Sequence, residues 1–103
     1  MTVVGFGQGN GSVDLSNAKA YPVPFKSTSG LPGVTFTGLT TGSTIKIFTA
    51  DGHLVQTLHS EGENVLWQLN NRNNEKIASG VYFYRVDNGS AGQVKEGKVV
   101  IIQ

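Results

Sequence analysis

Apolar and polar residues alternate along most of the chain after about residue 18, and a period of two is typical of β-strands with one buried and one exposed face. Ile45 and Ile47 show this spacing, as do Val65 and Trp67. Turn-forming residues interrupt the pattern roughly every ten residues. The pattern predicts seven strands, at Lys19–Phe25, Gly33–Gly38, Ser43–Thr49, Leu54–His59, Asn64–Leu69, Gly80–Asp87 and Val94–Ile102.

The clearest hairpin signal is Asp51-Gly52, because glycine accepts the positive φ that a tight turn between twisted strands needs. Asn88-Gly89 predicts a second hairpin, while Thr41-Gly42 and Glu61-Gly62 separate their strands less sharply. In a chain of 103 residues, this spacing predicts an all-β, immunoglobulin- or fibronectin-like antiparallel β-sandwich of about seven strands. A small closed barrel is the alternative.

The first 17 residues have a different composition, with glycine at positions 5, 7, 9 and 11 among polar residues. We expect residues 1–17 to be a flexible linker and residues 18–103 to be the domain. A phosphate-binding loop would need a preceding strand and a following helix, and neither is predicted. The segment also lacks the basic and long apolar regions of a signal peptide, so we expect any export signal to lie outside this sequence.

Charge and composition exclude several functional classes. The net charge is +1 and the eight lysines and arginines are scattered, so we expect no nucleic-acid partner. The longest apolar run, residues 99–102, is far shorter than the ~20 residues that span a bilayer, so we expect no membrane insertion. The absence of cysteine excludes disulfides, thiolate metal sites and cysteine nucleophiles.

Candidate catalytic residues do not assemble into a site. His53 and His59 flank one predicted strand and would lie roughly 20 Å apart, too far to share a metal. Two Ser-x-x-Lys patterns occur, Ser16–Lys19 and Ser43–Lys46, but positions i and i+3 of a strand face opposite sides. We therefore predict that this chain is not an enzyme and has no cofactor.

Two further groups of residues allow a binding role or a structural one. The Asn70–Glu75 loop carries oxygen ligands that suit calcium, but a polar turn with a left-handed asparagine is the favoured interpretation. Alternation points Trp67 into the core, so a sugar-binding platform would need Tyr82, Tyr84 and Phe48. Of these, we expect Tyr84 to be exposed.

Five landmarks follow one another in order: residues 21–25 (YPVPF), 45–58, Trp67, 78–86 and 97–103. In this arrangement, residues 18–103 resemble the C-terminal domains of proteins secreted by the type IX secretion pathway. They are also similar to the related immunoglobulin-like domain of the flagellar hook-capping protein. In the hook-capping relatives an Asp-Gly pair follows the tryptophan, whereas this chain has Gln68 and Leu69.

The resemblance also implies particular structural or recognition residues. The family opening reads Tyr-Pro-Asn-Pro, which Pro22 and Pro24 match and Val23 does not. Because proline lacks a backbone donor, this opening is expected to be an edge strand. Gly80 permits a sharp entry into the strand that carries Tyr82, and the Tyr82 hydroxyl can reach a backbone partner. The implied set is Pro22, Pro24, Gly52, Gly80, Tyr82 and Lys98.

The resemblance implies a non-catalytic C-terminal sorting or anchoring module of an extracytoplasmic protein. Its partners would be the secretion machinery and an upstream cargo domain in the same chain, and we expect the isolated domain to be monomeric. Two alternatives remain from other functional classes. One is an assembly domain like that of the hook-capping protein, and the other is a carbohydrate-binding module of a secreted glycosidase.

Overall fold

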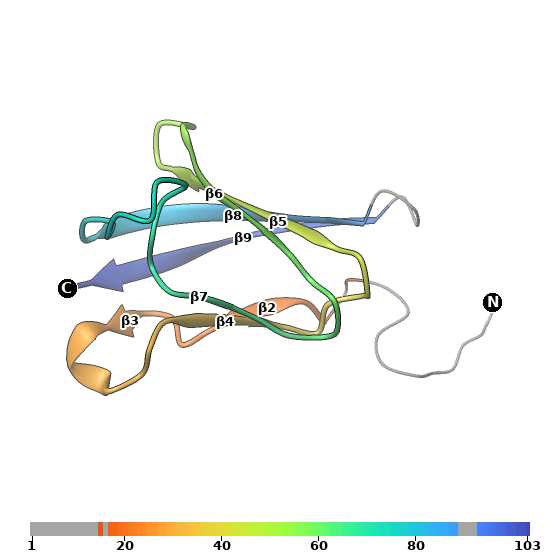
Figure 1. Cartoon of the computed structure of the whole chain (residues 1–103), viewed down its shortest axis with the longest axis horizontal. Helices are drawn as coiled ribbons and strands as arrows, with labels where there is room; N and C mark the ends of the chain where they lie inside the picture. The colour runs from red at the N-terminus through yellow and green to blue at the C-terminus, as the bar shows by residue number, and fades with distance from the viewer. Residues whose placement is uncertain (1–14, 16, 89–92) are drawn as a thin grey trace.

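The computed structural model describes residues 15, 17–88 and 93–103, and the regular structure there is β apart from one 3-10 turn (Figure 1). None of the described residues belongs to a helix long and apolar enough to cross a membrane. The elements are β2 (Lys19–Tyr21), β3 (Phe25–Lys26), η1 (Ser27–Ser29), β4 (Val34–Thr37), β5 (Thr44–Thr49), β6 (Leu54–His59), β7 (Val65–Trp67), β8 (Gly80–Asn88) and β9 (Gln93–Ile102).

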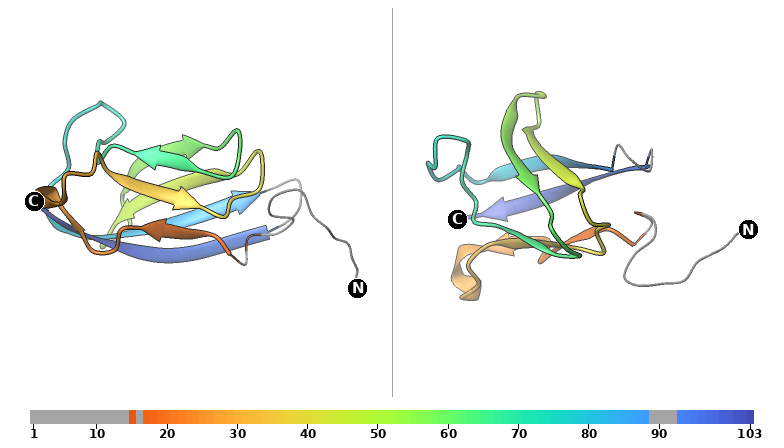
Figure 2. Two further views of the ribbon diagram at one scale, coloured as in Figure 1. Left: turned by 90° about the horizontal axis from the view of Figure 1, so that it is seen from below. Right: turned by 45° about the vertical axis from the view of Figure 1, so that its right-hand side comes forward.

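The strands form two sheets that pack face to face. One has the order β2-β4-β7 and the other the order β3-β9-β8-β5-β6. Figure 2, in its left view, looks onto the three-stranded sheet with the larger sheet behind it. The predicted β-sandwich is therefore confirmed. All strand pairs are antiparallel except β3 with β9, which is parallel.

The single strand predicted at Lys19–Phe25 is wrong, because this segment forms two strands that belong to different sheets. Pro22 and Pro24 lie between them, each after a cis peptide bond. Neither proline has an N–H to donate to a ladder, so regular pairing stops here and the chain passes from one sheet to the other. Both resulting strands lie at sheet edges, which confirms the edge position expected from the prolines.

The core lies between the two inner faces and includes aromatic contacts across the sandwich. The Phe36 and Tyr84 rings meet edge to face with centroids 5.1 Å apart. Leu15 is also a core residue, only 3% exposed, and its carbonyl accepts a hydrogen bond from the Ala18 N–H. The expected linker otherwise lies outside the described residues, apart from exposed Asn17. The buried core thus reaches back to residue 15.

The turns follow the glycine positions. Gly52 in the β5–β6 hairpin has φ +94°, and Gly42 before β5 has φ +84°. Residue Gly89 of the second predicted hairpin lies outside the described residues. The strands on either side of it, β8 and β9, pair antiparallel from Gly80 opposite Ile101 to Asn88 opposite Gln93.

One glycine is required by a close approach of two backbones. A Cβ built on Gly33 would lie 2.0 Å from the carbonyl oxygen of Trp67, on the neighbouring strand. The β4–β7 pair can form only because this side chain is missing. We predict that Gly33→Ala lowers the free energy of unfolding by about 1–3 kcal/mol.

Gly62→Ala is the matched control, since a Cβ there would meet nothing within 4 Å. Urea unfolding followed by the fluorescence of Trp67, the one tryptophan of the chain, measures both variants. Equal stability of the two variants would contradict the proposed backbone contact.

Candidate recognition end of the sandwich

The residues implied by the resemblance gather mainly at one end of the sandwich, the end at which the chain finishes in Figure 1. Gly80, the first residue of β8, lies opposite Ile101 of β9. On its other side, Ile101 lies beside Phe25, which directly follows Pro24. Three segments far apart in the sequence therefore meet here.

Tyr82 extends this region to the β5–β6 hairpin, because it lies opposite Thr49, the last residue of β5. Gly52 is in that hairpin. The Tyr82 hydroxyl donates a hydrogen bond to the Ala78 carbonyl at 2.7 Å, which confirms the expected backbone partner. Lys98 lies further along β9, exposed and opposite Phe83 of β8, on the outer face of the larger sheet.

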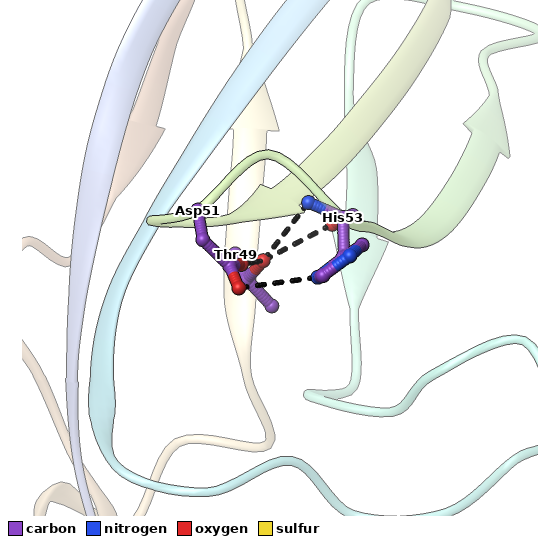
Figure 3. A network of polar contacts seen from close by, with 3 residues as sticks. All are labelled: Thr49, Asp51 and His53. Carbon is purple, nitrogen blue, oxygen red and sulfur yellow. Dashed lines mark hydrogen bonds and ion pairs between the residues drawn. The ribbon is translucent and has the colours of Figure 1, made fainter.

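The hairpin turn contains a small polar network (Figure 3). The Thr49 hydroxyl donates to the Asp51 carboxylate and accepts from the backbone N–H of His53 at 3.0 Å. The His53 Nδ1 atom lies 3.2 Å from the second carboxylate oxygen. The Thr49 carbonyl accepts from the N–H of Gly52, which closes the turn.

The network has the residue types of a hydrolase triad but not its geometry. In a triad the hydroxyl donates to the imidazole, which then acts as its base. Here the Thr49 hydroxyl donates to Asp51 instead, so the His53 ring is not in a position to take its proton. The hydrogen bond from Thr49 is the main cause that lowers the pKa of Asp51 below its ordinary value of 3.8, assisted by the nearby His53. The arrangement stabilises the turn.

A lowered carboxyl pKa makes the turn sensitive to acid. The stabilisation is present above pH 3.8 and is lost as the pH falls through the lower pKa of the folded state. We predict that Asp51→Asn lowers stability at neutral pH and removes this part of the acid dependence. Thr49→Val should have the same effect, since it removes the main hydrogen bond. Unfolding curves between neutral and acidic pH test this, and an acid dependence unchanged in both variants would contradict it.

The two histidines are separated as predicted. His53 is in the turn before β6, and His59 is the last residue of that strand, with Nδ1 3.4 Å from the Thr44 hydroxyl. Among residues 15, 17–88 and 93–103, no three histidine, aspartate or glutamate side chains form a group that could hold a metal ion.

The second Ser-x-x-Lys pattern is also split between two environments. Ser43 is fully buried and donates to the Thr40 carbonyl at 2.6 Å, while Lys46 is exposed. The Ser43 N–H donates in turn to the Ser60 hydroxyl at 3.1 Å. Ser43 therefore links the loop before β5 to the residue that follows β6. Ser16 of the first pattern lies outside the described residues.

The Asn70–Glu75 loop is held by its own amide groups. The Asn71 side-chain oxygen accepts from the backbone N–H groups of Asn73 and Glu75, both at 2.9 Å, and its NH₂ donates to the Glu75 carboxylate at 3.0 Å. Asn74 has φ +63°, which confirms the left-handed asparagine. These oxygens are used within the loop, which is the geometry of a polar turn.

The exposure of the aromatic side chains differs in part from the prediction. Trp67 is fully buried, as predicted, but Tyr84 is only 7% exposed and its predicted exposure is wrong. Tyr82 is buried on the same face, whereas Val81 and Phe83 are 41% and 43% exposed. Sequence reasoning missed these two because β8 is apolar at every position from 81 to 84, so alternation did not show which pair faces solvent.

Burial raises the pKa of Tyr82 and of Tyr84 above 10.0. The neutral phenols therefore stabilise the fold fully below pH 10, and this contribution is lost as the pH rises through their folded pKa values. We predict that Tyr82→Phe, which leaves the Ala78 carbonyl without its donor, costs about 0.5–1.5 kcal/mol at neutral pH. Tyr21→Phe is the control, since Tyr21 is 61% exposed. Equal stability of the two variants in denaturant unfolding would contradict the structural role.

One groove lies beside the hairpin and another lies on the larger sheet. The first, about 510 Å³, lies between the hairpin and the loop that precedes β8 and is lined by Thr49, Leu54, Val55, Asn71, Arg72, Asn73, Ile77, Ala78 and Tyr82. The second, about 410 Å³, lies on the larger sheet and is lined by Phe48, Phe83, Tyr84, Arg85, Glu96, Gly97 and Lys98.

Two solved structures with a similar fold come from Porphyromonas gingivalis. PorZ, an essential bacterial surface component of the type-IX secretion system of Porphyromonas gingivalis, matches with a TM-score of 0.79 and 29% identity. Dimeric latent PorU from the same organism matches with a TM-score of 0.59 and 22% identity, a likeness of fold alone. The alignments cover 92% and 82% of this chain but only 13% and 9% of those chains.

No curated protein sequence matches the chain. Residues 19–103, however, match the sequence model of the family described as the secretion system C-terminal sorting domain. This match begins at the first residue of β2 and includes every described strand. The chain therefore belongs to the family of secretion system C-terminal sorting domains.

Proposed function

We propose that residues 19–103 are the sorting signal of a type IX secretion substrate and direct an upstream cargo domain through the outer-membrane apparatus. Family membership supports a role in sorting and implies a protein that is secreted or held at the cell surface. The observation that carries the proposal is the extent of the match, which includes both sheets of the sandwich. The whole folded unit, rather than a short tail, is thus the candidate signal.

The proposed role is non-catalytic, and the contacts of the polar side chains support it. The Thr49 hydroxyl, the Ser43 hydroxyl and the Asn71 amide all make hydrogen bonds that hold turns or loops. Each of the three side chains thus has a structural role in holding its turn or loop, which supports a non-catalytic domain.

The residues implied by the resemblance divide into two kinds. Gly52 and Tyr82 shape the hairpin and the start of β8, so their part in recognition is indirect. Lys98 is exposed and forms no ion pair with any residue that the structure describes, so it is available for direct contact. Pro24 is exposed at the same end.

The structure bears on one of the two alternatives, the carbohydrate-binding module. A sugar platform would need Tyr82 and Tyr84 on the surface, and both are buried. The assembly role, like that of the hook-capping protein, stays a prediction that self-association of the isolated chain would support.

A fusion protein tests the proposed function. The chain is joined to the C-terminus of a reporter that has its own signal for export to the periplasm, in a host with the type IX pathway. We expect the reporter on the surface or in the medium, and in the periplasm when residues 93–103, which include all of β9, are deleted. A full fusion that stays in the periplasm, or that leaves it equally in a strain without the pathway, would contradict the proposal.

A further inference from the structure

The outer face of the five-stranded sheet, the face turned away from the other sheet, has an apolar patch. Phe83 is 43% exposed and lies between Phe48 of β5 and Lys98 of β9. One row further along, Val81 lies opposite Val100, and Ile102 is the next outward residue of β9. We call the apolar residues of this group the outer-face patch: Phe48, Val81, Phe83, Val100 and Ile102.

The register makes the patch continuous, since neighbouring residues on one sheet face contact each other. Single exposed apolar residues are ordinary on a protein surface, whereas a contiguous group marks an interaction site. The other sheet provides a comparison within the same molecule. On its outer face, exposed Tyr21 and Leu66 are separated by Thr35, which pairs with both.

The charges beside the outer-face patch are unbalanced. In the described strands of this sheet, the register places four basic side chains and two acidic ones on the outer face: Lys26, Lys46, Arg85 and Lys98, with Asp87 and Glu96. Arg85 lies 3.7 Å from Glu96 and 4.0 Å from Asp87, so it pairs with both acids. Lys46 and Lys98 have no ion pair within the described residues. The patch is therefore apolar with free positive charge at its side.

We propose that the outer-face patch is the docking surface for a segment of a secretion-machinery protein that combines apolar side chains with carboxylates. This inference rests on the proposed sorting function, which requires such a partner. Carboxylates complement Lys46 and Lys98, and the groove of about 410 Å³ beside Phe83 accepts an apolar side chain.

The charges also bear on the other occupants. A second copy docked through the same patch would bring lysines toward lysines, which is unfavourable. An anionic lipid surface would be attracted by Lys46 and Lys98 as well. Glu96 is paired with Arg85 and offers no net repulsion, so lipid is distinguished from a polypeptide by the vesicle experiment below.

The reporter fusion tests the apolar part of the proposal. Phe83→Ser should lower the secreted fraction about tenfold or more, as expected for an aromatic anchor of an interface. Leu66→Ser is the matched control, an exposed apolar residue on the other outer face, and should change secretion less than about twofold. Equal secretion of the two variants would overturn the docking surface.

Thermal unfolding of both variants shows whether Phe83→Ser folds as well as Leu66→Ser. If it does not, Val81→Thr takes its place, because threonine keeps the branched shape and strand preference of valine. Normal secretion of Val81→Thr would then overturn the proposal.

The charged part is tested at Lys98. Lys98→Glu should reduce secretion more than Lys98→Gln, because glutamate repels an acidic partner whereas glutamine only loses the attraction. Lys19→Glu, an exposed lysine on the other sheet, is the control and should leave secretion unchanged. Equal effects of the glutamate and glutamine variants would overturn the acidic partner.

Direct measurements on the purified chain test the other occupants. We expect no binding to phosphatidylglycerol vesicles and a monomer in sedimentation. Vesicle binding or self-association that Phe83→Ser abolishes would assign the patch to lipid or to a second copy and overturn the proposal. Failure of the unmodified fusion to be secreted contradicts the proposed function and withdraws the docking surface with it. Normal secretion of both the unmodified fusion and Phe83→Ser overturns the docking surface alone.

Discussion

The packing of Trp67 between the two sheets is the contact on which the rest of the structure depends. Its ring is fully buried and meets Tyr82 edge to face, with centroids 6.0 Å apart. Its indole N–H donates to the Asn70 carbonyl at 2.9 Å, which fixes the start of the polar loop before β8. Its backbone meets Gly33, the residue directly before β4. One side chain thus connects the sheet interface, the loop and the first residues of β8.

The sandwich could be predicted because alternation and turn glycines are local signals. Gly52 takes the positive φ expected of a hairpin turn, and Trp67 is buried as the alternation of its strand indicates. The entry strand could not be predicted, since only the pairing of Phe25 with Ile101 shows that it joins the second sheet. The candidate site was partly predictable. Tyr82 and its backbone partner followed from the resemblance, but the exposure of Phe83 depends on which face of β8 the other sheet covers.

In the proposed role, the two faces of β8 divide stability and recognition between them. Inward residues such as Tyr82 and Tyr84 make the aromatic contacts of the core. Outward residues such as Val81 and Phe83 contribute little to that core and lie beside Lys98. The inward residues hold the strand in place. The outward residues are therefore already ordered, and little further conformational entropy is lost when a partner binds them. A folded sorting domain therefore offers a rigid docking face, which a disordered tail does not.

Competition inside the cell tests the central claim most directly. The chain is exported alone and in excess to the periplasm of a host with the type IX pathway, and the secretion of the host's own type IX substrates is measured. If the chain is a recognised sorting domain, it occupies the machinery and the secreted amount of those substrates falls as its level rises. Unchanged secretion in the presence of abundant, folded chain would contradict the account.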